Sequence, residues 1–190
     1  MKSSKINEKL LLIRLKKKDP DAYGEIYDLY VTPIYRFIYF KVATQQDAED
    51  LTSEVFLKIW VYITDTDHKI DNLRALLYRT ARNLVIDSYR KKAKRDLVQG
   101  TELLNTIEDE KQQSLLTNIE IGIEMKNIEK VLRKMKDEYR EILILRYIEE
   151  LSISEIAKVL EKTKGSVRVS LHRALKVARD LSNQNGKTTN

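Results

Sequence analysis

Apolar residues along most of the chain recur every three or four positions, which is the period of an α-helix. The pattern is clear over residues 8–95 and again from residue 123, and it is poor between these stretches. We therefore predict an all-α protein with two small helical domains, residues 1–96 and 124–183. A flexible linker is expected over residues 97–123 and a disordered tail over residues 184–190.

The first domain is predicted to begin with two helices and an aromatic stretch. A short helix spans Glu8–Lys18, and Asp19–Asp21, with a proline in its middle, is typical of the start of the next helix. Thr32–Pro33 predicts a restart of the helix, because proline has no backbone N–H to donate. Residues 34–42 are rich in aromatic side chains, which more often form core than a binding site.

A longer helix follows Thr44, whose hydroxyl is expected to cap it together with Asp47, three residues later. One apolar face of this helix consists of Ala48, Leu51, Val55, Ile59 and Tyr62. Phe56 and Trp60 form a second apolar strip. A helix with two such strips can contact both its own core and a partner, or it can bury both strips internally. The pattern leaves these alternatives open.

Residues 72–95, NLRALLYRTARNLVIDSYRKKAKR, predict the most distinctive helix of the chain, which follows a polar loop over residues 64–72. The segment carries eight positive charges and one negative charge, and it contains no Gly or Pro. Its inner face is predicted to consist of Leu73, Leu77, Thr80 and Leu84, and its outer face of Arg79, Arg82, Asn83, Ile86 and Arg90. A charge run alone is usually a solvated face. The concentration of positive charge, and the Asn83 amide, which can hydrogen-bond to a base edge, favour a nucleic-acid contact.

The second domain is predicted to end in a helix-turn-helix. One helix is expected around Met125–Met135, and Asp137 can cap the next. Ser152 and Glu155 form a capping box that opens a third helix. A short turn over residues 162–165 then leads to a basic helix over residues 166–181. An ordinary helical hairpin remains the alternative.

Charge and composition narrow the function. Residues 1–96, 97–123 and 124–190 carry net charges of +5, −4 and +5, so two basic blocks flank an acidic connector. This distribution suggests two modules that each meet a polyanion. With no Cys and two distant His, the chain offers no thiolate metal site, and it contains no HExxH motif, Gly-rich phosphate loop or nucleophile elbow. We expect no cofactor, no metal and no enzymatic activity. The absence of a signal peptide or a long apolar run predicts a soluble, cytoplasmic protein.

Three segments resemble bacterial sigma factors of the primary-sigma superfamily, specifically the small extracytoplasmic-function type. QDAEDLTSEVFLKIW, residues 46–60, is similar to the helix of that family that binds core RNA polymerase. YRTARNLVIDSYRKKAKR, residues 78–95, is similar to its minus-ten-element helix. LSISEIAKVLEKTKGSVRVSLHRALKVAR, residues 151–179, is similar to its minus-thirty-five helix-turn-helix. Because the three segments occur in the family's order, the resemblance is more specific than any one of them.

The resemblance implies three sets of site residues. Core polymerase would be bound by Asp47, Asp50, Ser53, Glu54 and Lys58. The minus-ten element would be bound and melted through His68, Lys69, Arg74, Arg79, Arg82, Asn83, Ile86 and Arg90. The minus-thirty-five element would be read in the duplex by Ser166, Arg168, Val169, Ser170, His172, Arg173 and Lys176.

The resemblance also implies partners, and the chain differs from the family at a few positions. Core RNA polymerase, promoter DNA and an anti-sigma factor are the expected partners of a monomer, with the acidic linker threading the polymerase cleft. The family usually has Gln where Ser53 stands and often Trp where Leu76 stands. Its helix-turn-helix turn usually reads Gly-Ile-Pro, whereas residues 161–163 here read Glu-Lys-Thr, and Lys162 is expected to loosen the packing of the turn.

Other classes of function fit less well. A one-component transcriptional regulator would use only the C-terminal helix-turn-helix, and it leaves the basic helix of the first domain without a purpose. An enzyme acting on nucleic acid would need carboxylates that converge on a metal, whereas Asp47, Glu49 and Asp50 lie at one helix start and suit its dipole. A membrane-surface helix would need bulky apolar flanks beside the basic faces.

Overall fold

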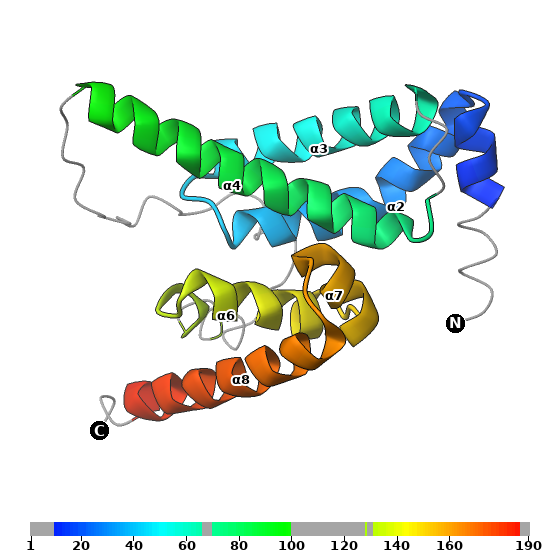
Figure 1. The fold of residues 1–190 in the computed structure, drawn as a ribbon. Helices are drawn as coiled ribbons and strands as arrows, with labels where there is room; N and C mark the ends of the chain where they lie inside the picture. Colours follow the sequence, from blue (N-terminus) through cyan, green and yellow to red (C-terminus); the bar gives the residue numbers. More distant parts are fainter. Residues whose placement is uncertain (1–9, 66–69, 100–127, 129–130, 187–190) are drawn as a thin grey trace. The chain divides into compact units, whose positions relative to one another are not determined.

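A computed structural model of the chain describes residues 10–65, 70–99, 128 and 131–186, and over these residues all the regular elements are helices (Figure 1). The predicted all-α class is therefore confirmed. The chain divides into two compact units, residues 1–106 and 107–190, which are described separately. None of the described helices is long and apolar enough to cross a membrane.

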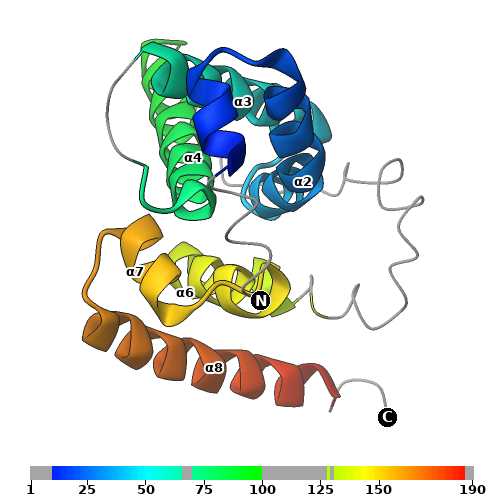
Figure 2. The same cartoon turned by 90° about the vertical axis from the view of Figure 1, so that its right-hand side faces the viewer.

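The first unit is built from three long helices, α2 (Pro20–Tyr39), α3 (Gln45–Asp65) and α4 (Leu73–Gln99), each of which packs against the other two. Residues 10–16 form a further short helix before α2 (Figure 2). The core between the helices is apolar, and its largest fully buried side chains include Leu15, Ile26, Ile34, Phe37, Ile38, Phe56, Ile59, Ile63, Leu73, Leu77 and Tyr78. α4 continues to Gln99, three residues past the predicted end of the domain at residue 96.

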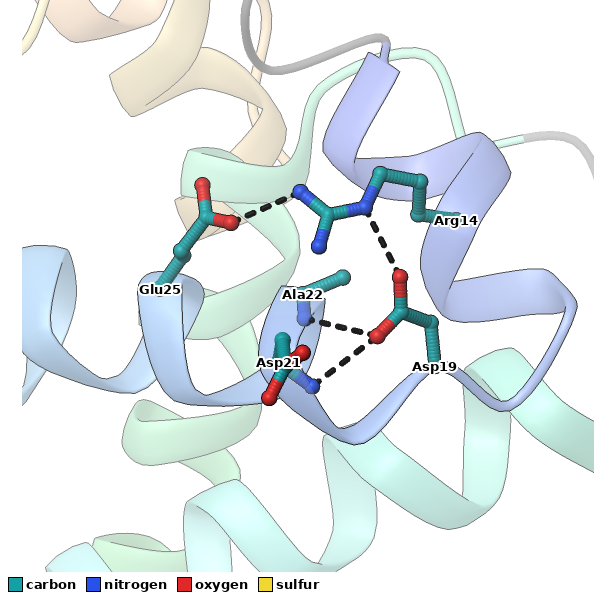
Figure 3. A network of polar contacts seen from close by, with 5 residues as sticks. All are labelled: Arg14, Asp19, Asp21, Ala22 and Glu25. Carbon is teal, nitrogen blue, oxygen red and sulfur yellow. Dashed lines mark hydrogen bonds and ion pairs between the residues drawn. The ribbon is translucent and has the colours of Figure 1, made fainter.

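The start of α2 is fixed by Asp19, as the sequence predicts. Its carboxylate accepts hydrogen bonds from the backbone N–H groups of Asp21 (3.0 Å) and Ala22 (3.4 Å). Arg14 donates to the other oxygen of Asp19 (2.8 Å) and to Glu25 (2.7 Å), so one guanidinium links the first helical turn to α2 (Figure 3). The hydrogen bond from Arg14 holds the pKa of Asp19 below its ordinary value.

Asp19→Ala is expected to lower the Tm of the protein by a few degrees, because it removes both the N-cap of α2 and the partner of Arg14. Asp19→Asn keeps an oxygen that can cap the helix and removes only the negative charge, so it should lose less. Thermal unfolding followed by circular dichroism measures both variants. If both variants lowered the Tm equally, the helix cap would have no stabilising role separate from the ion pair with Arg14.

The predicted restart at Thr32–Pro33 is wrong, because α2 runs through Pro33 without ending. A proline inside a helix removes one hydrogen bond and typically costs about 3 kcal/mol. Ile26 before the proline, and Ile34 and Phe37 after it, are fully buried. A continuous helix keeps these side chains on one face, and their burial outweighs the lost hydrogen bond.

α3 is capped as predicted, but it uses its second apolar strip differently. The Thr44 hydroxyl accepts from the Asp47 N–H (3.1 Å) and donates to the Asp47 carboxylate (2.7 Å). Phe56 contacts Tyr27 of α2 at a ring-centroid distance of 4.8 Å. Trp60 meets Tyr23, also of α2, edge to face at 5.0 Å. Phe56 is therefore buried within the unit, whereas Trp60 packs on α2 but stays half-exposed, so the strip is covered internally only in part.

α4 presents a broad face to the core. The Asn72 side chain caps its start by accepting from the Ala75 N–H at 2.7 Å, a cap that the sequence analysis missed. Among the residues predicted to face inward, Leu73, Leu77 and Leu84 are buried and Thr80 is half-buried. Tyr78 is also fully buried, with its ring edge to face on Phe37 at 5.4 Å.

The second unit contains α6 (Asp137–Leu143), a π-helical segment η1 (Ile144–Ile148) that continues it, α7 (Ile153–Leu160) and α8 (Lys164–Gly186). α6 and α7 both pack against α8 (Figure 2). Asp137 was predicted to cap its helix, but Lys136 holds that position without a side-chain hydrogen bond and Asp137 lies in the first turn. Of the earlier predicted helix, Met125 lies outside the described residues, whereas Leu132 and Met135 are buried.

The helix-turn-helix of α7 and α8 is confirmed as a local fold, with one change in its turn. The predicted capping box is present, since Ser152 and Glu155 bond to each other's backbone N–H. Gly165 was predicted to lie in the turn, but α8 already begins at Lys164, where the hydroxyl of Thr163 caps it by accepting from the Ser166 N–H. The residue that turns the chain is Glu161, with a left-handed φ of 54°. It stands where the family that the chain resembles usually has glycine, the residue that adopts this conformation most easily.

Candidate functional site

Four side chains on the outer side of α3 form an exposed strip that combines two carboxylates with two apolar groups. Asp50, Glu54, Leu57 and Val61 follow one another at spacings of three or four residues, so they share a helix face. Leu57 and Val61 have 61% and 47% of their surface exposed, so two aliphatic groups meet solvent at adjacent turns of one helix. We call these four residues the α3 strip. Its chemistry suits a partner surface that is partly basic and partly apolar.

Polar contacts within α3 orient the carboxylates of the strip. Gln46 donates to Asp50 at 2.9 Å, and Lys58 pairs with Glu54 at 3.2 Å. The Ser53 hydroxyl donates to the Glu49 backbone carbonyl at 3.1 Å, which bonds this side chain back onto its own helix. Asp50, Ser53, Glu54 and Lys58, all predicted from the sequence, therefore lie together on or beside the strip.

Leu57 and Val61 were missed by the sequence analysis, which assigned the apolar residues of this helix to two other strips. Their signal was present, because Ser53, Leu57 and Val61 follow at four-residue spacing along the polar side of the helix. An apolar pair on a polar helix face is a mark of an interaction surface.

Asp47 differs from the other predicted polymerase-binding residues, because its carboxylate is engaged inside the unit. Lys92 of α4 pairs with it at 2.8 Å, and Thr44 donates to the same carboxylate. Partial burial acts to raise the pKa of Asp47, but the hydrogen bonds from Lys92 and Thr44 outweigh it and leave that pKa below the ordinary value. Asp47 thus joins α3 to α4 and lies outside the α3 strip.

The outer face of α4 carries the predicted minus-ten residues. Asn83 and Arg90 are exposed and lie two turns apart, while Ile86 between them is half-exposed. Arg90 pairs with Asp87 at 3.5 Å on the same face. Arg74, Arg79 and Arg82 are half-exposed residues. His68 and Lys69, which were predicted to hold a flipped base, lie outside the described residues.

Two features make this face of α4 suited to nucleic acid. It presents several guanidinium groups, which bind phosphate in a bidentate manner, beside one amide that can pair with a base edge. The opposite face is anchored by fully buried side chains such as Leu77 and Tyr78, so the donors are held on a rigid element. Rigid presentation lowers the conformational entropy that binding would otherwise cost.

The predicted minus-thirty-five residues lie on the exposed side of α8, with one exception. Ser166, Arg168, Val169, His172, Arg173 and Lys176 are exposed. Ser170 is half-buried, because it borders the stripe of Val167 and Ala174 that packs into the core. Val169 exposes 51% of its surface among the basic side chains, and an aliphatic group there can contact a thymine methyl group.

The turn before α8 is braced by an ion pair. Lys162 binds Glu138 of α6 at 2.8 Å, so the lysine that was expected to loosen the turn contributes a cross-link between two helices. Over the residues that the structure describes, no three His, Asp or Glu side chains come together as a metal-binding group.

Comparisons with known proteins bear on both units. Residues 26–95 match the model for sigma-70 region 2, and residues 125–177 match the model for sigma-70, region 4. The ECF RNA polymerase sigma factor SigW of Bacillus subtilis (strain 168) is 34% identical over 173 residues, covering 87% of this chain and 91% of that protein. SigM of the same strain, also an ECF RNA polymerase sigma factor, is 28% identical over 84% of this chain and 94% of its own length.

Solved structures show the same fold at lower identity. A chain in the structure of CnrH in complex with the cytosolic domain of CnrY matches with a TM-score of 0.69 at 18% identity, over 94% of this chain and 98% of that chain. A chain in the co-crystal structure of the sigma factor RpoE with the anti-sigma factor NepR from Bartonella quintana gives a TM-score of 0.67 at 20% identity, over 84% and 95%.

Proposed function

The chain belongs to the ECF RNA polymerase sigma factors, and from that premise we propose how its three surfaces divide the work of transcription initiation. A sigma factor binds core RNA polymerase, recognises promoter DNA and promotes its melting. The observation that carries the assignment is the presence in one chain of a region 2 match over α2–α4 and a region 4 match over the helix-turn-helix. A one-component regulator that uses only the helix-turn-helix is not favoured, because it leaves the region 2 match unexplained.

The α3 strip is our proposed contact with core polymerase. Its apolar members, Leu57 and Val61, would supply burial at the centre of the interface, and Asp50 and Glu54 would pair with basic side chains around it. This division follows the usual anatomy of an interface, with an apolar centre and a polar rim. Ser53 and Lys58 lie beside the strip and would contribute at its edge.

The outer face of α4 is our proposed reader of the melted minus-ten element. Asn83 would contact a base exposed in the single strand, and Arg79, Arg82 and Arg90 would hold the backbone phosphates. Arg74 and Ile86 complete the set. His68 and Lys69 remain predictions for the adjoining loop, where a flipped base would be held.

α8 is our proposed reader of the minus-thirty-five duplex. A helix exposed along one side fits the major groove, where a guanidinium can bind guanine and an aliphatic group can contact thymine. We expect Arg173 and Lys176 to do so, because both are exposed while Val167 and Ala174 hold the other side of α8 in the core.

Further partners follow from the same assignment. The RpoE structure contains an anti-sigma factor, and we propose that an anti-sigma factor also controls this chain. The protein would act where RNA polymerase acts, in the cytoplasm, as an initiation factor without catalytic residues of its own. The segment over residues 97–123 would connect the two DNA-binding domains through the polymerase, and its net charge of −4 suits a channel built for nucleic acid.

Run-off transcription with core polymerase tests the function as a whole. Core polymerase plus this protein should produce discrete transcripts from genomic fragments, and core polymerase alone should not. Failure to co-elute with core polymerase, together with retained binding to a DNA site by the helix-turn-helix, would favour the one-component regulator instead.

A further inference from the structure

Two contacts tie the basic end of α4 to the α2–α3 connection and to the first turn of α3. The phenol of Tyr89 donates a hydrogen bond to the backbone carbonyl of Lys41. One turn further along, the Lys92 ammonium pairs with the Asp47 carboxylate at 2.8 Å. We call these two contacts the α4 bracket. Both link residues more than 40 positions apart in the sequence, so they fix the packing of one helix against another element.

The bracket lies at the edge of the buried side of α4, where Tyr89 is 48% exposed and the Lys92 side chain 44%. Ala81, Val85, Tyr89 and Lys92 follow at spacings of four, four and three residues, so Tyr89 and Lys92 continue the stripe of the buried Ala81 and Val85. Arg90 and Asn83 belong to the outer side. Lys92 thus belongs to the basic run in sequence, but its ammonium pairs with Asp47 within the unit.

The anchors of the bracket are themselves held in place. Lys41 is only 3% exposed, and its ammonium lies 5.8 Å from the centroid of the Phe37 ring. Asp47 lies in the first turn of α3, where Thr44 bonds to both its N–H and its carboxylate. A contact with such fixed points can set the direction of the end of α4, which a contact with a mobile side chain could not.

We propose that Tyr89 and Lys92 are positioning residues, which hold the distal half of α4 in the orientation that the minus-ten strand requires, with Lys41 and Asp47 as their anchors. This inference rests on the proposed role of α4. It gives Asp47 a different task from the one implied by the family resemblance, because its carboxylate supports the DNA-binding helix through Lys92. On this proposal Lys92 supports the helix and is not itself a phosphate contact.

Asp47→Asn separates positioning from simple charge attraction. This variant makes the protein one unit more positive, so attraction alone would strengthen its binding to DNA. If Asp47 instead positions α4, the variant should bind DNA more weakly. In the holoenzyme, Asp47→Asn and Lys92→Gln should each weaken binding to a promoter probe with a pre-melted minus-ten element by about two- to five-fold, the range of a partly exposed ion pair. The double variant should lose little more than either single one.

Salt dependence and hydrogen exchange complete the test. Lys92→Gln should leave the slope of log affinity against log salt unchanged, whereas Lys94→Gln, which removes an equal charge from the exposed side, should lower it if Lys94 meets phosphate. In the free protein, Asp47→Asn, Lys92→Gln and Tyr89→Phe should each speed amide exchange in residues 89–95, and Lys94→Gln should not.

Distinct results would overturn the bracket and the proposed function. Tighter DNA binding by Asp47→Asn, or a reduced salt slope for Lys92→Gln, would show that Lys92 acts as a phosphate contact. Unchanged exchange in all three bracket variants would show that these contacts do not hold α4. If the wild-type holoenzyme failed to bind the pre-melted probe, the proposed role of α4 would fail, and the exchange data on the free protein would still decide whether the bracket exists.

Discussion

Arg173→Ala is expected to lower the affinity of the holoenzyme for a duplex minus-thirty-five element by about 5- to 100-fold, and pre-melting the minus-ten element should not restore it. Arg173 lies on the exposed side of α8, whereas Val167 and Ala174 are buried. A fork that pairs with a guanine contributes about 1–3 kcal/mol of discrimination. Binding to matched duplex probes, measured by fluorescence anisotropy, provides the number.

Asn83→Ala should show the reverse pattern, with duplex affinity kept and a melting defect that a pre-melted probe relieves. Asn83 lies on α4 in the other unit, and we expect it to act only on bases that melting exposes. The variant should keep its affinity for the upstream duplex and fail to hold the open bubble. A probe with a pre-melted minus-ten element should partly bypass this defect. Permanganate reactivity of unpaired thymines reports the bubble directly.

Arg173→Lys is the matched control, because it keeps the positive charge and loses the bidentate fork. If Arg173 reads a base, the Arg173→Lys variant should bind the duplex almost as weakly as the Arg173→Ala variant. If Arg173 meets only phosphate, Lys should bind almost as well as Arg, and the Ala variant should show a reduced salt slope. Identical responses of the Arg173 and Asn83 variants on duplex and pre-melted probes would refute the division of work between α4 and α8.

The parts of this fold that could be predicted from the sequence are those decided within a few residues. Asp19, Thr44 and Ser152 cap helices by reaching backbone N–H groups two or three positions ahead. Such contacts need no knowledge of the tertiary structure. The inner and outer faces of α8 could also be predicted from the sequence, because the helical period assigns each side chain to one side of the helix.

The parts that could not be predicted depend on elements that are distant in the sequence. Local sequence rules predict that a helix ends at Pro33. The continuous helix is more stable only because Ile26 and Phe37 are buried in the same core. Phe56 and Trp60 could equally have faced a partner until the rings of α2 were seen to pack against them. The pairing of Asp47 with Lys92, 45 residues away, has no local signal at all.

The candidate site was predictable to a similar degree. The basic faces of α4 and α8 were recognised from charge and spacing. Leu57 and Val61 were not recognised, because the prediction followed the two apolar strips of this helix and both residues lie on its polar side. Their exposure could be found only after the packing of α2 and α4 against α3 showed which sides of α3 were already covered.

Reversing both charges of the α3 strip, in Asp50→Lys/Glu54→Lys, is expected to weaken binding to core RNA polymerase by more than about ten-fold. The two carboxylates lie one turn apart on the exposed side of α3. If they face basic side chains of the polymerase, the reversal removes two attractive pairs and replaces them with like charges. Co-elution with core polymerase, and a titration with a labelled sigma factor, measure the loss.

Leu57→Asp tests the apolar half of the same strip. Because the Leu57 side chain is 61% exposed, the substitution should leave the thermal stability of the free protein nearly unchanged. At the interface it would place an unpaired carboxylate against an apolar surface, which is strongly unfavourable on binding. We therefore expect Leu57→Asp to match or exceed the double charge reversal in its effect on core polymerase.

Asp21→Lys/Asp28→Lys provides the control, because it changes the net charge by the same amount at two exposed carboxylates of α2, outside the strip. It should bind core polymerase nearly as well as the wild-type protein. Equal weakening by the control would mean that overall charge governs the association, and the α3 strip would lose its claim to be the interface. Loss of binding by the charge variant alone, with Leu57→Asp unaffected, would place the contact on the carboxylates and away from Leu57. Only a loss in both, with the control unaffected, fits an interface whose apolar centre is covered by the polymerase and whose charged edge selects it.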